Sequence, residues 1–491
     1  MTESRIADYD VVIIGGGPGG ATLGSLLGIA GRRVLILEKD IHPRDHVGES
    51  LVPSTNLVFD RMGVLEKIHD AGFVPKPGSA WNAPRSALWK FIEVWLFSVD
   101  IAGNTQPFTY HVERDVLDTI LLRHAHESGA KVLQGVKARS VLFEDGRAVG
   151  VKAEAADGWE RDLGARVVVD ASGRRCFLAT QLGMKRKDPN FNQFCIYSWF
   201  RGVKPPPERL RGFGLFYFLG LSKGWGWHFP LRNDRWSMGV VVDKDDFARA
   251  GSSPGEFFNS MVRRNRTFAY AMQDAERIRP WWIEGDYSYK VDRFAGPGWI
   301  LAGDALRFVD PIFSSGVDVA LYSSMYAHEA ITQAWHTGDE AKAFDTFQRQ
   351  VTEGVDVWYD MIDAFYRLQN LLSWFAIRRA WKEKLTRALQ GNPYDPDTQQ
   401  SSRILLDAMN ESYERVMADP NNLLRPWSFD QRLREFAVWQ GGEGQFLPCP
   451  TCGGRVRLDS DKELLVCTKC GTSYPMISDK KLSGGHATHP A

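Results

Sequence analysis

A glycine-rich turn between two apolar segments constrains this chain more than any other feature. Residues 15–20 read GGGPGG and follow the apolar residues 11–14, as a tight turn follows the first strand of a nucleotide-binding unit. Gly15, Gly17 and Gly20 satisfy the pattern GxGxxG, which lets the backbone turn sharply and brings helix N–H groups against a pyrophosphate. A second apolar segment, residues 34–37, ends at Glu38, whose carboxylate can accept ribose hydroxyls. This arrangement favours a dinucleotide site over a fortuitous glycine-rich loop.

Two further segments indicate that the dinucleotide is FAD rather than NAD. Residues 167–174 read VVVDASGR, an apolar strand that breaks at Asp170 into a glycine turn. Residues 298–316 read GWILAGDALRFVDPIFSSG, in which a buried strand delivers Asp304 to a helix start. The latter resembles the segment by which flavin monooxygenase-type folds bind the ribityl chain. The resemblance implies an α/β, FAD-binding Rossmann-like fold of the p-hydroxybenzoate hydroxylase type with an antiparallel substrate-domain sheet; the alternative is two ordinary strand–turn–helix units.

A WxWxxP element, GWGWHFP at residues 224–230, narrows the family. Together with VGESLVP at residues 47–53, the lysine of GFVPKPG at residues 72–78 and the PIFSSG turn, it resembles the signature of flavin-dependent halogenases of the phenol or pyrrole type. The resemblance covers roughly residues 8–329. The alternative for Trp225 and Trp227, two positions apart on a strand, is that they fill the core on one face of a sheet.

The resemblance implies a mechanism in which reduced FAD, oxygen and chloride or bromide give hypohalous acid. The halide is then expected at the turn Ser314, Ser315 and Gly316, where backbone N–H groups can form an anion-binding concavity. Lys76 is expected to hold the hypohalous acid, or carry the halogen on its amine, and deliver it to an aromatic ring; the alternative for Lys76 is a solvated loop lysine. Trp225 and Trp227 would separate flavin from substrate. The implied FAD-binding residues are Gly15, Gly17, Gly20, Glu38, Arg44, Ser50, Arg114, Gly303, Asp304 and Pro311.

One departure from the family bears on the substrate, and a second requirement concerns the electron donor. Halogenases of free tryptophan carry a glutamate just before the serine-rich turn, where this chain has Phe313. An electron-rich phenol or pyrrole, free or tethered to a carrier protein, is therefore the expected substrate. Only one GxGxxG with its acid is present, so a separate flavin reductase is expected to supply reduced FAD. Alternatives are an FAD-dependent aromatic monooxygenase or oxidoreductase of the same fold, and a non-catalytic binding protein.

Four cysteines near the C-terminus have the spacing of a zinc ribbon. Cys449 and Cys452 form CPTC, and after a 14-residue gap Cys467 and Cys470 form CTKC. Four thiolates can surround one tetrahedral zinc ion and leave no open position, so a structural or docking role is expected. A redox dithiol or disulfides are the alternative. Many halogenases lack such a ribbon, and the two remaining cysteines, Cys176 and Cys195, are predicted to be core thiols.

Composition sets limits on partners and location. With 60 basic and 60 acidic residues the formal net charge is zero, which argues against binding to nucleic acid or an anionic membrane. The charge-free residues 11–31 contain the glycine turn, and no secretory signal pattern starts the chain. A cytoplasmic protein is expected.

The markers divide the 491 residues into six parts. We predict the first part of the FAD domain over 1–185, a substrate-binding antiparallel sheet over 186–292, an FAD-domain return segment over 293–335, a helical region over 336–440, the zinc ribbon over 445–480 and a disordered tail over 481–491. In the helical region one apolar stripe predicts an amphipathic helix packed on the main body, with a lid over the substrate cavity as the alternative. The stripe consists of Trp358, Met361, Phe365, Leu368, Leu372 and Phe375.

Overall fold

A parallel sheet around the glycine-rich turn forms the centre of the structure. The computed structural model describes residues 7–84, 86–221, 223–285, 288–367, 369–419, 452, 456–459 and 464–475. β1 (Tyr9–Ile14) lies between β2 (Val34–Glu38) and β10 (Glu160–Asp170), and β7 (Lys131–Gln134) and β20 (Trp299–Leu301) extend the sheet in parallel on either side. β19 (Ala295–Gly296) closes one edge in antiparallel fashion. β1, β2, β20 and the last part of β10 are largely buried, which explains why they read as continuous apolar runs, whereas the outer strand β7 is only partly buried.

The register of this sheet brings the chemistry-bearing ends of its strands together. Ile14 is paired with both Leu37 and Asp170. The Gly15 amide donates to the Leu37 carbonyl over 2.8 Å, and the Ala171 amide donates to the Ile14 carbonyl over 2.9 Å. Three parallel strands therefore end at one edge, which is where ligands bind in open α/β sheets.

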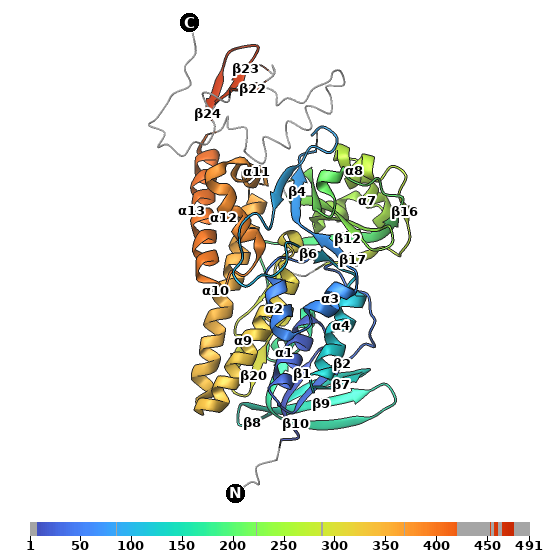
Figure 1. Ribbon diagram of the computed structural model, residues 1–491, viewed down its shortest axis with the longest axis vertical. Coiled ribbons are helices and arrows are strands. Elements are labelled where there is room, and N and C mark those ends of the chain that lie inside the picture. Colours follow the sequence, from blue (N-terminus) through green and yellow to red (C-terminus); the bar gives the residue numbers. More distant parts are fainter. Residues whose placement is uncertain are drawn as a thin grey trace.

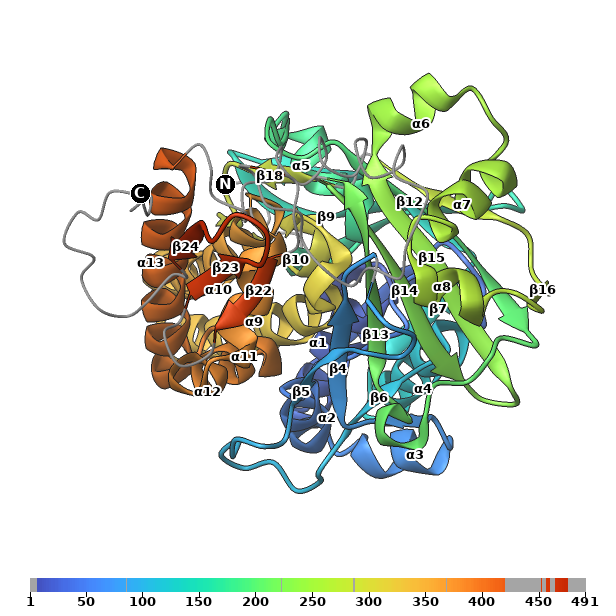
Figure 2. The same cartoon turned by 90° about the horizontal axis from the view of Figure 1, so that it is seen from above.

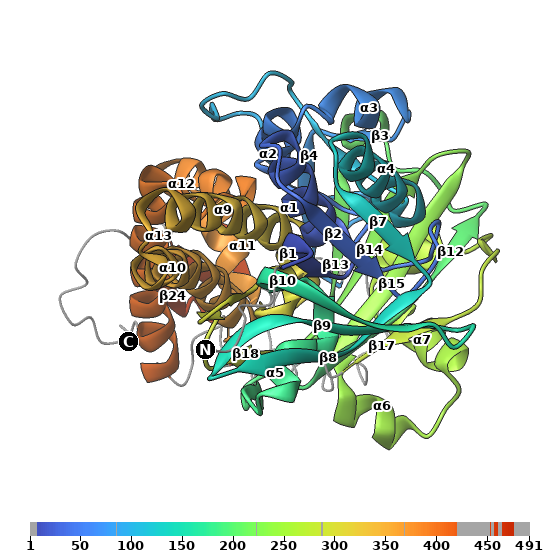
Figure 3. The same ribbon diagram turned by 90° about the horizontal axis from the view of Figure 1, so that it is seen from below.

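Helices and an antiparallel ribbon surround this sheet (Figures 1 and 3). α1 (Pro18–Ile29) packs between α4 (Arg114–Glu127) and α9 (Ser315–Thr337). β8 (Val136–Glu144) and β9 (Arg147–Ala155) form a ribbon that pairs with the first part of β10. The shorter elements outside the two large sheets are α2 (Thr55–Met62), α3 (Leu65–Asp70), α5 (Phe177–Gln181), β3 (Val74–Lys76), β6 (Thr109–His111), β11 (Lys185–Lys187), β18 (Tyr289–Val291) and β21 (Arg307–Phe308).

The second sheet carries the WxWxxP element. It runs in the order β16 (Glu276–Arg277), β12 (Gln193–Arg201), β15 (Arg235–Asp243), β14 (Gly224–Leu231), β13 (Gly214–Leu221), β4 (Gly78–Asn82) and β5 (Ile92–Trp95), with β17 (Trp282–Glu284) also on β12. The expectation of an antiparallel sheet confined to 186–292 is incomplete: β4 and β5 come from the N-terminal part of the chain, and β4 pairs with β13 in parallel. A parallel pair needs no hairpin, so residues distant in sequence can form it.

Aromatic packing fixes helices on the outer face of this sheet. α6 (Lys244–Ala250), α7 (Pro254–Val262) and α8 (Arg266–Ala271) lie beside β12 and β15, away from the C-terminal helices (Figure 2). Phe258 and Phe268 of α7 and α8 pack with Val240 in one buried cluster. The opposite face is therefore free to line the site.

The C-terminal region is helical up to Ala418, as predicted, whereas residues 420–440 of the predicted helical region and the predicted tail 481–491 lie outside the described residues. α10 (Glu340–Arg367), α11 (Gln369–Ile377), α12 (Arg379–Gln390) and α13 (Pro396–Ala418) follow α9. The apolar stripe does not lie on one helix but runs across α10 and α11; its described members are buried, whereas Leu368 lies outside the described residues. Near the end of the chain β22 (Val456–Asp459), β23 (Leu464–Cys467) and β24 (Ser473–Pro475) form a small antiparallel sheet. None of the described helices is both long and apolar enough to cross a membrane.

Candidate active site

A cavity of about 460 Å³ opens at the carboxyl ends of the central strands. It extends from the β1–α1 turn past the loop after β2 to the start of α9, and the tryptophans of β14 form part of its wall. The residues predicted from the sequence that line it are Gly15, Gly17, Glu38, Arg44, Ser50, Arg114, Trp225, Trp227, Gly303, Asp304, Pro311, Ser314 and Gly316. Gly20, Ser315 and Lys76 do not line it.

The three glycines of the first turn have different surroundings. Gly15 has φ +108°, and a Cβ there would lie 2.3 Å from the Ala171 carbonyl oxygen. A Cβ on Gly20 would lie 1.9 Å from the Gly15 carbonyl oxygen, so this glycine permits the turn to close and does not face the cavity. A Cβ on Gly17 would meet only the Arg44 guanidinium, at 3.4 Å. Gly17 thus leaves open the space through which a pyrophosphate can approach the start of α1, and the cradle fits FAD.

Glu38 lies at the far end of the cavity with its carboxylate already oriented. Its Oε2 accepts the Gly16 amide over 2.7 Å and its Oε1 accepts the Asp40 amide over 2.8 Å. Each carboxylate oxygen keeps a further lone pair, so the group can still accept ribose hydroxyls.

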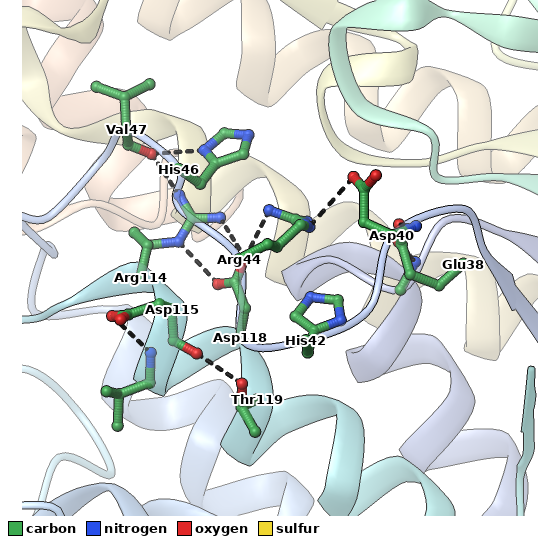
Figure 4. Close-up of polar contacts among 12 residues, drawn as sticks. Glu38, Asp40, His42, Arg44, His46, Val47, Arg114, Asp115, Asp118 and Thr119 are labelled. Carbon is green, nitrogen blue, oxygen red and sulfur yellow. Dashed lines mark hydrogen bonds and ion pairs between the residues drawn. The ribbon is translucent and has the colours of Figure 1, made fainter. Parts of the chain in front are cut away.

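Two arginines at the cavity share one buried carboxylate (Figure 4). Arg114 donates from Nε and Nη2 to Asp118 at 2.8 and 3.0 Å, and from Nη1 to the Val47 carbonyl at 2.7 Å. Arg44 Nη1 lies 3.5 Å from Asp118 Oδ2. Burial alone would raise the pKa of Asp118, but the two guanidinium groups hold that pKa below its usual value. Asp118 was not predicted; its signal was the spacing Arg114-x-x-x-Asp118, which places an ion pair on one helix face.

The start of α9 forms the other end of the cavity. Asp304 lies in a short 3-10 helix, Gly303–Ala305, where burial raises the pKa of its carboxyl group to about 6 against the opposing effect of Arg174 and Arg114. Ser314 has φ +57° and links the 3-10 helix Pro311–Phe313 to α9. Ser314 and Gly316 face the cavity, whereas Ser315, the first residue of α9, does not.

Lys76 lies in a second, smaller cavity of about 30 Å³. Ser314 lines both cavities, so the two cavities adjoin at this residue. Lys76 is 2 % exposed, and its Nζ donates to Ser50 Oγ over 2.9 Å and to the Leu51 carbonyl over 2.7 Å. Burial lowers the pKa of Lys76 to about 7, so near pH 7 part of the protein molecules carry Lys76 as a neutral amine. The interpretation of Lys76 as a solvated loop lysine is therefore wrong.

Apolar side chains form most of the wall around Lys76. Sequence reasoning identified Lys76, Phe313, Ser314, Phe365 and Leu372 individually, but not that they meet. Phe313 also packs against Trp358 and Phe365, so it serves the core and the cavity together. The lining residues are Val52, Lys76, Ser79, Trp81, Phe216, Phe218, Ile312, Phe313, Ser314, Phe365, Leu372 and Leu389. Leu372 and Leu389 come from α11 and α12, so the C-terminal helices close this cavity.

Three of the four C-terminal cysteines lie together. The Sγ atoms of Cys452, Cys467 and Cys470 lie within 4.8 Å of one another, and Cys449 lies outside the described residues. Cys452 and Cys467 are separated by 3.6 Å between sulfurs, too far for a disulfide and close to the ~3.8 Å edge of a tetrahedron with Zn–S bonds of ~2.3 Å. The amides of Lys469 and Cys470 donate to Cys467 Sγ at 3.4 Å.

The two remaining cysteines are buried, as predicted for core thiols. Cys176 is 0 % exposed and Cys195 is 2 % exposed. Burial raises the pKa of the Cys176 thiol to about 11, which leaves little thiolate at neutral pH.

The fold and the cavity define an FAD-dependent oxidoreductase. The family described as "FAD binding domain" matches residues 8–353. The chain is 36 % identical to the 1H-pyrrole-2-carbonyl-[peptidyl-carrier protein] chlorinase of Pseudomonas fluorescens, over 87 % of this chain and 98 % of that one. It is 31 % identical to the corresponding brominase of Pseudoalteromonas luteoviolacea, over 84 % of this chain and 98 % of the other.

A solved structure supports the same assignment. That of the flavin-dependent brominase Bmp2 matches with a TM-score of 0.74 and 27 % identity, over 83 % of this chain and 99 % of the other. The chain belongs to the flavin-dependent halogenases, enzymes that use FAD and a halide co-substrate for electrophilic halogenation.

Proposed function

We propose that the chain halogenates a pyrrole-type ring held as a thioester on a carrier protein, and that Lys76 delivers the halogen. This proposal rests mainly on a buried lysine in an apolar cavity that shares Ser314 with the large cavity. The two pyrrolyl-carrier halogenases named above support this substrate class. Within the described lining of the small cavity there is no carboxylate, which suits a ring whose own heteroatom stabilises the cationic intermediate.

The residues of the large cavity would hold FAD along its length. Glu38 would accept the adenosine ribose, Gly17 and the start of α1 the pyrophosphate with Arg44 nearby, and Asp304 the ribityl chain. When bound, reduced FAD supplies with oxygen the two-electron oxidation of halide to hypohalous acid. The turn at Ser314 and Gly316 would hold the halide through backbone N–H groups at the start of α9, but not through that of Ser314, which already donates to the Pro311 carbonyl over 3.0 Å.

Lys76 would receive the oxidised halogen from the other side of Ser314. A compact ammonium can polarise hypohalous acid, and a neutral amine can carry the halogen. In the transfer, a ring C–H bond is replaced by a carbon–halogen bond, the ring proton is lost and the oxygen of hypohalous acid leaves as water. The buried Trp225 and Trp227 would keep the ring away from the flavin.

Two further components belong to the proposal. A separate reductase is proposed as the source of reduced FAD. The cysteine cluster is proposed to bind one structural zinc ion, because three sulfurs have the required proximity and the fourth ligand, Cys449, has ribbon spacing. Metal analysis of the purified chain tests this directly, with about one zinc per chain expected.

The substrate proposal is tested by mass spectrometry of a carrier-bound pyrrole-2-carbonyl thioester. The thioester is incubated with the enzyme, chemically reduced FAD, oxygen and either chloride or bromide; free pyrrole-2-carboxylate and a free phenol are run in parallel. Halogen-for-hydrogen exchange on the thioester that requires halide is expected. Oxygen insertion without halide would indicate a monooxygenase, and halogenation of the phenol alone would replace the substrate class.

A further inference from the structure

The two tryptophans of the WxWxxP element each donate an indole hydrogen bond to a buried hydroxyl group. Trp225 Nε1 donates to the hydroxyl of Tyr366 over 2.8 Å, and Tyr366 comes from α10, far away in sequence. Trp227 Nε1 donates to Ser237 Oγ over 3.0 Å, across the pair of strands β14 and β15. Neither hydroxyl was singled out by a sequence motif.

Each hydroxyl in turn contacts a buried carboxyl group. The Tyr366 hydroxyl donates to Asp310 Oδ2 over 2.9 Å, and Ser237 Oγ donates to Glu49 Oε1 over 3.2 Å. An indole N–H can only donate, so a hydroxyl that accepts from it has its single proton left for the carboxylate. The direction of both relays is therefore set by the indoles. Asp310 is 1 % exposed and Glu49 is 2 % exposed, so water does not compete for these bonds.

The two carboxyl groups, of Asp310 and Glu49, belong to the two segments whose relative position matters for the proposed reaction. Asp310 Oδ1 accepts the Ile312 amide over 3.0 Å and so caps the 3-10 turn that leads into Ser314. Glu49 directly precedes Ser50 and Leu51, the two residues that accept both hydrogen bonds of Lys76. Trp227 is thereby connected to the anchor of Lys76, and Trp225 to the halide turn.

We propose that Tyr366 and Ser237 are positioning residues of the halogenation reaction. Through them the tryptophan pair holds the halide turn and the Lys76 anchor in a fixed relative position. This inference rests on the roles proposed above for Ser314 and Lys76. Buried polar groups are usually hydrogen-bonded in any protein, so the test needs a readout other than stability.

The first test measures bromide binding to the protein loaded with oxidised FAD, without turnover. Tyr366→Phe keeps the ring and removes the hydroxyl. Tyr359→Phe on the same helix is the matched control, since the Tyr359 hydroxyl accepts from Asn190 at 2.9 Å and donates to no carboxylate among the described residues. The bromide dissociation constant, read from the visible spectrum of FAD, should rise about five- to tenfold for Tyr366→Phe. FAD affinity should stay within about twofold, and Tyr359→Phe should match the parent. Asp310→Asn, which keeps an acceptor for Ile312, is the second variant if Tyr366→Phe fails to fold.

The second test concerns the Lys76 anchor. Ser237→Ala is compared with Ser198→Ala, a buried serine on the neighbouring strand whose Oγ donates to the Arg279 carbonyl over 2.8 Å. The fraction of oxidised halide captured by monochlorodimedone in solution, rather than by the thioester, should rise several-fold for Ser237→Ala only, with bromide affinity unchanged.

The two tests distinguish this proposal from the substrate assignment. The bromide measurement needs no organic substrate, so an inactive thioester would leave it intact. If Tyr366→Phe and Asp310→Asn both bind bromide like the parent, and Ser237→Ala partitions halogen like Ser198→Ala, the residues serve the core alone and the proposal is wrong.

Discussion

At the residue scale, the glycines of the first turn show that one motif can contain different physical roles. At Gly15 and Gly20 a side chain would collide with backbone atoms. At Gly17 a side chain would instead occupy space beside the cavity. Gly17→Val should therefore fold and lose FAD affinity by at least tenfold, because the branched side chain occupies the pyrophosphate approach. FAD titration followed by fluorescence checks this. Gly15→Ala is the contrasting variant and should lower stability itself; unchanged FAD affinity in Gly17→Val would remove this turn from the site.

The buried carboxyl group of Asp318 predicts that the stability of the folded chain depends on pH. Burial raises the pKa of Asp318 to about 7, although the hydroxyl of Ser54 donates to it. The folded chain then holds a proton that the unfolded chain releases above its ordinary pKa of 3.8, so this group lowers stability as the pH rises from about 4 to 7. Asp318→Asn should remove this component, and its stability relative to the parent should be about 2 to 4 kcal/mol greater at pH 8 than at pH 5. Urea unfolding at both pH values measures the difference; an identical pH profile in both proteins would contradict it.

At the element scale, α10 contains a glycine that its neighbour requires. A Cβ on Gly354 would lie 2.0 Å from Tyr394 Cε1, in the segment that links α12 and α13. In an exposed helix, Gly→Ala stabilises by about 1 kcal/mol. Here Gly354→Ala should destabilise by about 1 to 3 kcal/mol, because the Tyr394 ring must move.

A double-mutant cycle separates this packing effect from helix propensity. In the background of Tyr394→Leu, Gly354→Ala should cause much less destabilisation, as measured by thermal unfolding. A rise in the melting temperature of Gly354→Ala alone would show that propensity wins and that the ring adapts.

Some helices and strands could be predicted from the sequence, and others could not. The strand, turn and strand around GGGPGG have apolar runs and glycines within 30 residues, so local pattern was sufficient. The helical stripe was predicted correctly as an apolar face, but its division between α10 and α11 carries no glycine or proline signal between Arg367 and Gln369. The parallel pairing of β4 with β13 is a contact between distant segments and has no local signature.

At the scale of the whole molecule, the site is assembled from parts that are distant in sequence. The motifs identified most of the predicted residues that line the large cavity, and Lys76, because each motif is short and chemically distinctive. Ser237 and Tyr366 belong to no such pattern, since their roles depend on which helix or strand packs beside them. Leu389 likewise lines the small cavity only because α12 folds back over it.

We expect the C-terminal cysteine segment and the FAD site to be stable independently of each other. If the cluster binds the proposed zinc ion, Cys467→Ser with Cys470→Ser should release it and increase proteolysis near the C-terminus, because a segment this short would depend on the metal for stability. FAD affinity should be unchanged, since no described residue of the large cavity lies beyond Ala320. Zinc content and limited proteolysis are measured together. A zinc-free parent protein that resists protease there would overturn the assignment.

The proposal that Lys76 delivers the halogen is tested most directly by comparing the parent with Lys76→Ala in one halogenation assay. Product is measured by mass spectrometry and flavin reoxidation by absorbance, with Lys67→Ala, an exposed lysine on α3, as the control. Lys76→Ala should reoxidise reduced FAD at nearly the parent rate but form at least a hundredfold less halogenated ring, on the order expected for loss of a group that acts on the reacting atoms. Halogenation by Lys76→Ala at the parent rate would contradict it.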